Sequence, residues 1–284
     1  LVGGTVSLEG KYVETSEMIK YGYELWENKV NSQGGILGRK VKLILYDDKS
    51  RPDLVKKYYR KLIEEDGVEL VLSPYGTPLT LVASEVTEQH GRVMIACGSA
   101  ANEPWERGYR YLFGIYALAD RYFISFLDVT ARRGLTDIAI IHEDNIFNNA
   151  IGNAAAKWTK RFGSQVVFHQ SFTDADPQLA NIVAELRQKK PDGVIFSAYP
   201  PNSYTFIELL KQHRYKPRTL GMTIVPTYPH FYEKVGKFAD GIFGISQWEA
   251  DERIPFPGTK QFIADFSKFT GRVPSYHAGS AFAE

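Results

Sequence analysis

One arrangement of strand, proline-broken turn and helix start occurs twice in this chain, and it limits the possible folds more than any other feature. Residues 70–73 are apolar enough to end a buried strand, and Pro74 and Gly76 then interrupt it. Thr77 and Pro78 are typical of a helix start, with a hydroxyl cap followed by proline at the first helical position. The turn therefore predicts a buried strand leading directly into a helix over residues 79–90.

The second copy lies at residues 194–202, which again read as strand, proline-broken turn and polar cap, followed by a helix over 203–213. The flanks agree as well, because Asp-Gly-Val precedes both strands and Gln-His ends both helices. Such turns place backbone N–H groups and hydroxyls at the carboxyl end of a strand, where α/β proteins bind small anionic groups. We interpret the repeat as two similar lobes whose turns face one another across a cleft.

Strands and helices are expected to alternate along the whole chain, which predicts parallel sheets with right-handed crossovers. At 284 residues the length also favours about two domains. The predicted class is therefore α/β, with two doubly wound, Rossmann-like lobes. Lobe I takes residues 1–116 plus 251–284, and lobe II takes residues 117–250. The first long helix is expected to be capped by Thr15 or Ser16.

The composition argues against several classes of function. A net charge of +1 without charged blocks gives no sign of nucleic-acid or membrane-surface binding. No apolar run approaches the roughly 18 residues of a transmembrane helix. No phosphate-binding glycine loop, G-x-S-x-G elbow or H-E-x-x-H pattern occurs. We therefore expect no enzyme activity, no cofactor and no metal. For the adjacent Asp47 and Asp48 we favour a role in a structural turn or at the cleft rim.

Six stretches together resemble type I periplasmic solute-binding proteins, the receptors of branched-chain amino acid and amide ABC transporters, which include the leucine-isoleucine-valine-binding proteins. The stretches are TVSLEG (5–10), NSQGGILGR (31–39), YDD (46–48) with Pro52, SPYGT (73–77), WERGY (105–109) and IIHED (140–144). The resemblance implies a "Venus flytrap" of two lobes joined by three crossings. The third crossing is expected beyond Glu284, and the start at Leu1 is interpreted as a mature or trimmed form.

The same resemblance assigns a first-lobe binding surface. Thr77 aligns with the family's hydroxyl that holds the ligand carboxylate, and Tyr75 and Gly76 precede it in the turn. Gly98, Ser99 and Ala100 align with a second loop that offers a carbonyl and a hydroxyl to the ligand ammonium. The alternative for Thr77 is a simple helix cap.

The second lobe departs from the family pattern at Thr223. Amino-acid-binding relatives carry there a glutamate that pairs with the ammonium. Without such a partner a desolvated ammonium costs several kcal/mol, so Thr223 argues against an ordinary α-amino acid. Glu143 or Glu249 could replace the missing carboxylate, although each is otherwise expected to be a solvated loop charge.

Aromatic residues are numerous enough to line the cleft as well as the cores. The candidates are Tyr12, Tyr75, Tyr116, Phe147, Tyr199 and Trp248. The alternative for each is packing beneath a loop, and we expect about half to be core. Cys97, the one cysteine, ends a strand; it is expected to be a small buried residue rather than a cleft residue.

The function implied is an extracytoplasmic or periplasmic receptor, with a lipid anchor as one option. It would bind a small carboxylate, amide or amino-acid-like ligand by hinge closure and pass it to a membrane ABC permease. We expect a monomer that binds no nucleic acid. The alternative is a ligand-sensing domain of the same fold, such as an amide sensor or receptor ectodomain; a two-lobe enzyme has no motif in its support.

Overall fold

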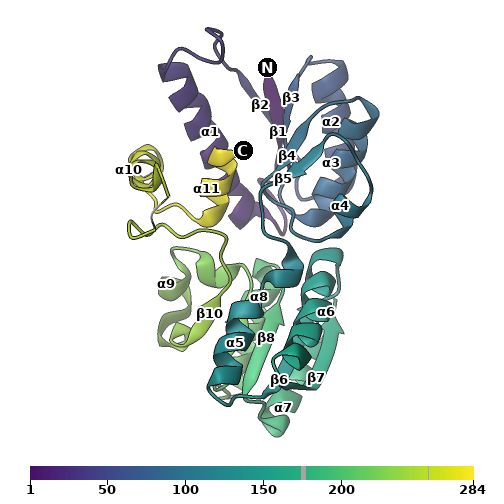
Figure 1. Ribbon diagram of the computed structural model, residues 1–284, viewed down its shortest axis with the longest axis vertical. Coiled ribbons are helices and arrows are strands. Elements are labelled where there is room, and N and C mark those ends of the chain that lie inside the picture. The colour runs from purple at the N-terminus through teal and green to yellow at the C-terminus, as the bar shows by residue number, and fades with distance from the viewer. Residues whose placement is uncertain (174–176, 255) are drawn as a thin grey trace. The chain divides into compact units, whose positions relative to one another are not determined.

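The computed structural model describes residues 1–173, 177–254 and 256–284 and, of Gln178, the backbone only. The chain divides into two compact units, shown in Figure 1. The first unit comprises Leu1–Tyr116 and Gln247–Glu284, and the second comprises Ala117–Ser246. The chain therefore passes between the units twice within these residues, after Tyr116 and after Ser246.

The first unit is built on a five-stranded sheet in the order β2-β1-β3-β4-β5, in which all neighbours are parallel. Its strands are β1 (Val2–Val6), β2 (Leu43–Asp47), β3 (Leu70–Leu72), β4 (Met94–Ala96) and β5 (Leu112–Gly114). Its helices are α1 (Val13–Ser32), α2 (Pro52–Glu64), α3 (Thr77–Gln89), α4 (Glu103–Glu106), α10 (Thr259–Thr270) and α11 (Tyr276–Ala283). Helices α1 and α11 lie on one face of the sheet, and α2 and α3 cover the other (Figure 1).

The start of α1 differs from the sequence prediction. The helix begins at Val13 with Tyr12 as its N-cap residue, so neither Thr15 nor Ser16 caps it. Ser16 instead accepts a hydrogen bond from the N–H of Ser7 at 2.7 Å. Its hydroxyl thus pairs a buried backbone group just after β1, a partner that a search for helix caps does not consider.

The second unit has a five-stranded sheet in the order β10-β9-β8-β6-β7, again entirely parallel. Its strands are β6 (Asp137–Glu143), β7 (Gln165–Phe172), β8 (Gly193–Ser197), β9 (Leu220–Met222) and β10 (Ile242–Gly244). Its α-helices are α5 (Ile124–Arg132), α6 (Ile146–Arg161), α7 (Gln178–Lys189), α8 (Pro200–Gln212) and α9 (Phe231–Val235). Short 3₁₀ turns are η1 (Ala119–Arg121), η2 (Val225–Thr227) and η3 (Gly236–Ala239).

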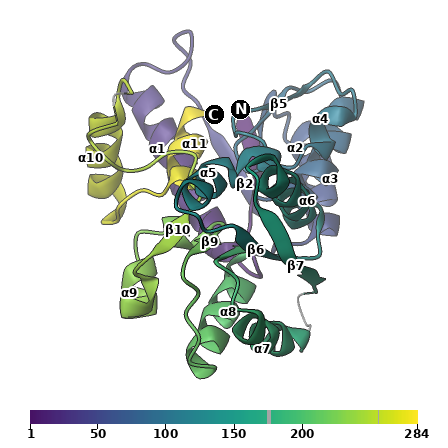
Figure 2. The same cartoon turned by 60° about the horizontal axis from the view of Figure 1, so that its bottom comes forward.

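Helices cover both faces of this second sheet, with α5 and α6 on one side and α7 and α8 on the other (Figure 2). The core beneath α8 is aromatic: the ring of Phe196 stacks on Phe206 at 3.9 Å and lies 5.7 Å from Phe172. Helix α8 begins at Pro200 with Tyr199 as its N-cap residue, three positions before the predicted start. Proline fits there because the first helical N–H groups have no partner within the helix.

The two sheets confirm the predicted class, α/β with two parallel, doubly wound lobes. Among the helices that the structure describes, none is both long and apolar enough to cross a bilayer.

Helices α1 and α11 pack so closely that Gly22 has no room for a side chain. A Cβ at Gly22 would lie 2.5 Å from the carbonyl oxygen of Ala278 and 2.9 Å from the Cβ of Ala281. An added methyl group that presses against backbone lowers stability by about 3 kcal/mol, whereas alanine in place of glycine raises the stability of a helix by about 1 kcal/mol. We expect Gly22→Ala to lower the free energy of unfolding in urea by about 2 kcal/mol. Asn28→Ala, at an exposed position of the same helix, is the control and should change it little.

Candidate functional site

In the first unit, the loops that follow β3 and β4 are joined by hydrogen bonds. The N–H of Gly76 donates to the carbonyl of Gly98 at 3.0 Å. A Cβ at Gly98 would lie 2.9 Å from Tyr75 Cα and 3.0 Å from the carbonyl oxygen of Pro74, so only glycine permits this approach. The predicted turn and the predicted second loop therefore form one surface within this unit.

Thr77 connects the same two loops through its side chain. Its hydroxyl oxygen accepts from the Ser99 hydroxyl at 3.2 Å and from the N–H of Ala101 at 3.4 Å. Thr77 is the first residue of α3, Gly76 is the N-cap with φ 89°, and no side-chain cap bond forms. The prediction that Thr77 caps the helix was therefore wrong. Ala100 lies buried between the two donors.

Two of the predicted aromatic residues lie beside one another in the first unit. The rings of Tyr12 and Tyr75 meet edge to face at 5.7 Å, and Tyr75 meets His277 in the same way at 5.4 Å. The N–H of Tyr12 also donates to the Ser50 hydroxyl at 3.1 Å. The loop carrying Tyr12 is thus tied to the segment that follows β2.

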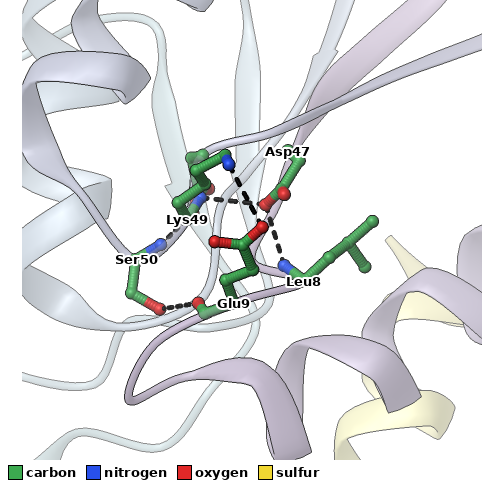
Figure 3. Close-up of polar contacts among 6 residues, drawn as sticks. Leu8, Glu9, Asp47, Lys49 and Ser50 are labelled. Carbon is green, nitrogen blue, oxygen red and sulfur yellow. Dashed lines mark hydrogen bonds and ion pairs between the residues drawn. The ribbon is translucent and has the colours of Figure 1, made fainter.

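Asp47 and Asp48 hold that segment in place, as predicted for a structural turn. Asp47 Oδ1 accepts from the N–H groups of Leu8 and Lys49, both at 2.9 Å (Figure 3). Asp48 is fully buried and accepts from the hydroxyls of Thr5 at 2.6 Å and Ser7 at 2.5 Å. Burial raises the pKa of Asp48, and these hydrogen bonds oppose that rise.

Tyr116 and Trp248, the other candidates of this unit, have different neighbours. The Tyr116 ring lies 5.7 Å from that of Tyr276. Trp248 lies 5.7 Å from Phe262 and packs on the apolar cluster between α1, α10 and α11. It also lines an open cavity of about 460 Å³ whose walls include neither Thr77 nor the loop at Gly98. Trp248 thus packs against this unit's core.

In the second unit, neutral polar side chains gather where β8 and β9 end. The Ser197 hydroxyl donates to Asn148 Oδ1 at 2.5 Å and lies 3.3 Å from the hydroxyl of Thr223. Asn148 in turn donates from its backbone to Asn145 Oδ1 at 3.1 Å, which caps α6. Thr223, Ser197 and Asn148 are all buried. The sequence prediction included Thr223 but missed the serine and the asparagine.

Glu143 corrects one expectation. It is only 2% exposed rather than solvated, because it ends β6 inside the unit. Its Oε2 accepts from the N–H of Tyr199 at 2.9 Å. The Tyr199 ring lies 5.9 Å from Phe147, so these two predicted residues are neighbours. Glu249, by contrast, is exposed, as expected.

The chain reverses sharply just after Thr223. Ile224 has φ 60° and ψ −79°, and the N–H of Val225 donates to the Thr223 carbonyl at 2.8 Å. This is a γ-turn of the strained kind. A positive φ in a β-branched residue costs on the order of 1–3 kcal/mol and is held only by its surroundings. The turn fixes the direction in which Thr223 leaves the sheet, and no sequence signal marks it.

A second glutamate, half-buried at Glu284, lies beneath the first unit's turn. Glu284 Oε1 accepts from the N–H of Ser73 at 2.9 Å, and its Oε2 lies 2.7 Å from the Tyr23 hydroxyl. The Tyr23 oxygen is also 3.1 Å from the Ser73 carbonyl and 3.3 Å from Cys97 Sγ. A protonated Glu284 can donate to Tyr23 while Tyr23 donates to Ser73, which satisfies both groups. Cys97 is fully buried, as predicted.

The structure therefore brings candidates together in each unit, gives Tyr116 and Trp248 other neighbours, and adds Asn148, Ser197 and His277. Ser197 ends β8, and Asn148 lies in the first turn of α6, shortly after β6, so a search of the strand ends and the segments that follow them could have found both. Within residues 1–173, 177–254 and 256–284, no three or more His, Cys, Asp or Glu side chains gather as they would around a metal ion.

Comparison with known proteins gives consistent matches over most of the chain. The profile of the family described as "Periplasmic binding protein" matches residues 2–284. Leu/Ile/Val-binding protein homolog 8 of Brucella abortus is 26% identical over 288 aligned positions, covering 96% of this chain and 70% of the relative.

Two solved structures have the same fold. One is the branched-chain amino acid transporter substrate-binding protein LivJ of Streptococcus pneumoniae in complex with isoleucine, with a TM-score of 0.90, 15% identity and coverage of 99% and 80% of the two chains. The other is an ABC transporter solute-binding protein of Rhodopseudomonas palustris in complex with 3,4-dihydroxybenzoic acid. It gives a TM-score of 0.82 at 20% identity, covering 99% and 77%.

Glu284 should make stability depend on pH. Burial raises its pKa from the ordinary 4.5 to about 8. Because the unfolded chain loses this proton first, the stabilising contribution is complete below pH 4.5 and is lost as the pH rises toward 8. Glu284→Gln carries no titratable proton. We therefore expect its free energy of urea unfolding, relative to wild type, to increase from pH 5 to pH 8.

Proposed function

The chain belongs to the periplasmic binding protein family, a family of solute-binding proteins and not of enzymes, and we propose that it captures a small carboxylate for an ABC importer. The ligand we favour is an acid without an α-ammonium group, and aromatic acids come first. Short amides and amino acids are the alternatives that an experiment has to separate.

The observation that carries this proposal is the hydrogen bonding of Thr77. In both hydrogen bonds that the structure gives this hydroxyl, its oxygen is the acceptor. The donors are the Ser99 hydroxyl and the N–H of Ala101. A threonine hydroxyl has two lone pairs and one proton, so the proton is left to donate. It does so at the first turn of α3, where the helix dipole favours an anion. A ligand carboxylate supplies both the acceptor and the charge.

The second unit supports an acid lacking an ammonium. Thr223 and its neighbours Ser197 and Asn148 are neutral, so they can hydrogen-bond a ligand without supplying a counter-charge. Desolvating an ammonium among them would cost several kcal/mol, and the buried carboxylate of this unit, Glu143, already accepts the N–H of Tyr199. Phe147 and Tyr199 offer apolar ring surface suited to a flat ligand.

Transport would follow from closure of the two units around the ligand. The chain passes between the units at Tyr116 and at Ser246, and these positions are the proposed hinges. A ligand shifts the open–closed equilibrium only as far as it binds the closed state more tightly. We propose that the closed monomer docks on a membrane ABC permease and works outside the cytoplasm, in the periplasm or attached to the outer face of the membrane by a lipid.

A thermal-shift screen tests the ligand class. The panel pairs leucine, isoleucine and phenylalanine with their deaminated acids, and adds benzoate, 3,4-dihydroxybenzoate and short amides. Binding to the native state raises stability by RT ln(1 + [L]/Kd). We expect shifts with the deaminated or aromatic acids and none with the amino acids. Shifts with the amino acids would overturn the assignment, and compaction in small-angle scattering with a hit would support closure.

Replacing Thr77 tests the carboxylate contact. With the best carboxylate from the screen, Thr77→Ala should weaken binding by about 1–3 kcal/mol in calorimetry, because a buried anion loses its donor. Thr77→Ser keeps the hydroxyl and is the matched control, with binding expected close to wild type. Equal affinity for the alanine variant and the wild type would remove Thr77 from the site.

A further inference from the structure

Two histidines that are far apart in the sequence lie side by side in the second unit. His142 is near the end of β6 and His169 lies on β7, the strand paired with it at the edge of the sheet. Their Nε2 atoms are 3.2 Å apart and their ring centroids 5.2 Å apart, with the rings inclined at 62°. His142 is 6% exposed, whereas His169 is open to solvent.

This separation suits a shared metal ion. Zinc bonds imidazole nitrogen at about 2.0–2.1 Å, and a tetrahedral angle between two such bonds places the nitrogens about 3.3 Å apart. The observed 3.2 Å is therefore close to the spacing of two ligands of one ion. A direct hydrogen bond between neutral rings has a similar length, so the tautomer and the surroundings have to be considered.

The tautomer of His142 is the one that a metal needs. Its Nδ1 lies 3.3 Å from the carbonyl oxygen of Glu143. A carbonyl can only accept, so this contact favours a proton on Nδ1 and leaves the Nε2 lone pair facing His169. Metal-binding histidines usually donate their other N–H to a carbonyl or carboxylate in this way.

The ring of His142 is also fixed from the side. A Cβ at Gly152 would lie 2.2 Å from its Cδ2 and 2.6 Å from its Nε2, so α6 passes directly against the imidazole. Such packing limits rotation of the ring, and a ligand held in one orientation loses less entropy on binding.

The charges around the pair suit a cation. Burial lowers the pKa of His142 and of His169, and it is the neutral imidazole that acts as a metal ligand. The backbone of Glu143, the carboxylate of Asp144 and the side chain of Asn149 act to raise the pKa of His142, and His169 acts to lower it. Asp144 thus adds negative charge in the neighbourhood of His142, and its carboxylate accepts from the Asn149 side chain at 2.8 Å.

We propose that His142 and His169 form a two-histidine site for a divalent transition metal ion such as Zn²⁺, with water completing the coordination. Solvent reaches it through His169 on the edge strand. The bound ion would fasten β7 to β6 and fix the end of β6, where Glu143 holds the backbone of Tyr199. The site rests on its own geometry and is independent of the proposed ligand class.

Calorimetry with zinc chloride tests the site on the intact, chelator-treated and tag-free protein. We expect one zinc per chain and a rise in Tm that EDTA reverses. His169→Gln should weaken zinc binding at least about tenfold. Loss of a residue that only supports a metal ligand already costs about that much, and His169 would be a ligand itself. His169→Cys should restore binding, since thiolate is a zinc ligand. Exposure of residue 169 makes folding of these variants secure.

The control is His90→Gln, because His90 Nε2 lies 2.9 Å from Glu64 Oε1 and could hold zinc elsewhere. That variant should bind zinc as the wild type does. Three results would each overturn the proposal: no saturable binding by the wild type, equal loss in His90→Gln, or full binding by His169→Gln.

Discussion

Each turn that carries candidate binding groups depends on a glutamate side chain from another part of its unit. The N–H of Ser73, after β3, donates to Glu284 at 2.9 Å, and that of Tyr199, after β8, donates to Glu143 at the same distance. Prolines follow both residues and end the strands, so neither N–H can be paired by continuing the sheet. An unpaired buried N–H would cost about 1–3 kcal/mol. The two carboxyls therefore determine whether the two turns can hold their positions.

The two carboxyls meet this requirement in different surroundings. Glu284 lies among Tyr23, Ser73 and Cys97, and desolvation outweighs its hydrogen bonds, so its pKa rises. Its protonated form can complete the chain of bonds through Tyr23 to the Ser73 carbonyl. Glu143 instead ends β6, an interior strand of its sheet, and accepts the N–H of Tyr199. The backbone N–H groups of Ser73 and Tyr199 thus both have a glutamate as acceptor, but the two glutamates have different polar neighbours.

Local patterns in the sequence predicted the class of fold, the alternation of elements and the similarity of the two turns, because proline, glycine and apolar runs act on neighbouring residues. The family resemblance placed Thr77, Gly98 and Ser99 in one surface, and the structure brings those residues together. The predicted helix cap at Thr15 or Ser16 and the predicted exposure of Glu143 were wrong, because the roles of these residues depend on partners distant in the sequence. The pairing of His142 with His169 follows from strand register, which spacing along the chain does not reveal.

Glu143 also bears on the choice between an amino acid and a simple acid. Among the described residues of the second unit it is the one acidic side chain that is buried. An α-ammonium would need this carboxylate while its Oε2 already accepts the N–H of Tyr199. One carboxylate can accept several hydrogen bonds. An ammonium bound to Glu143 would nevertheless weaken the hydrogen bond from the N–H of Tyr199, which holds the turn. A deaminated acid makes no such demand, since the hydroxyls of Ser197 and Thr223 can meet a neutral group directly. The arrangement that stabilises the turn is therefore a further reason to propose a ligand without an ammonium.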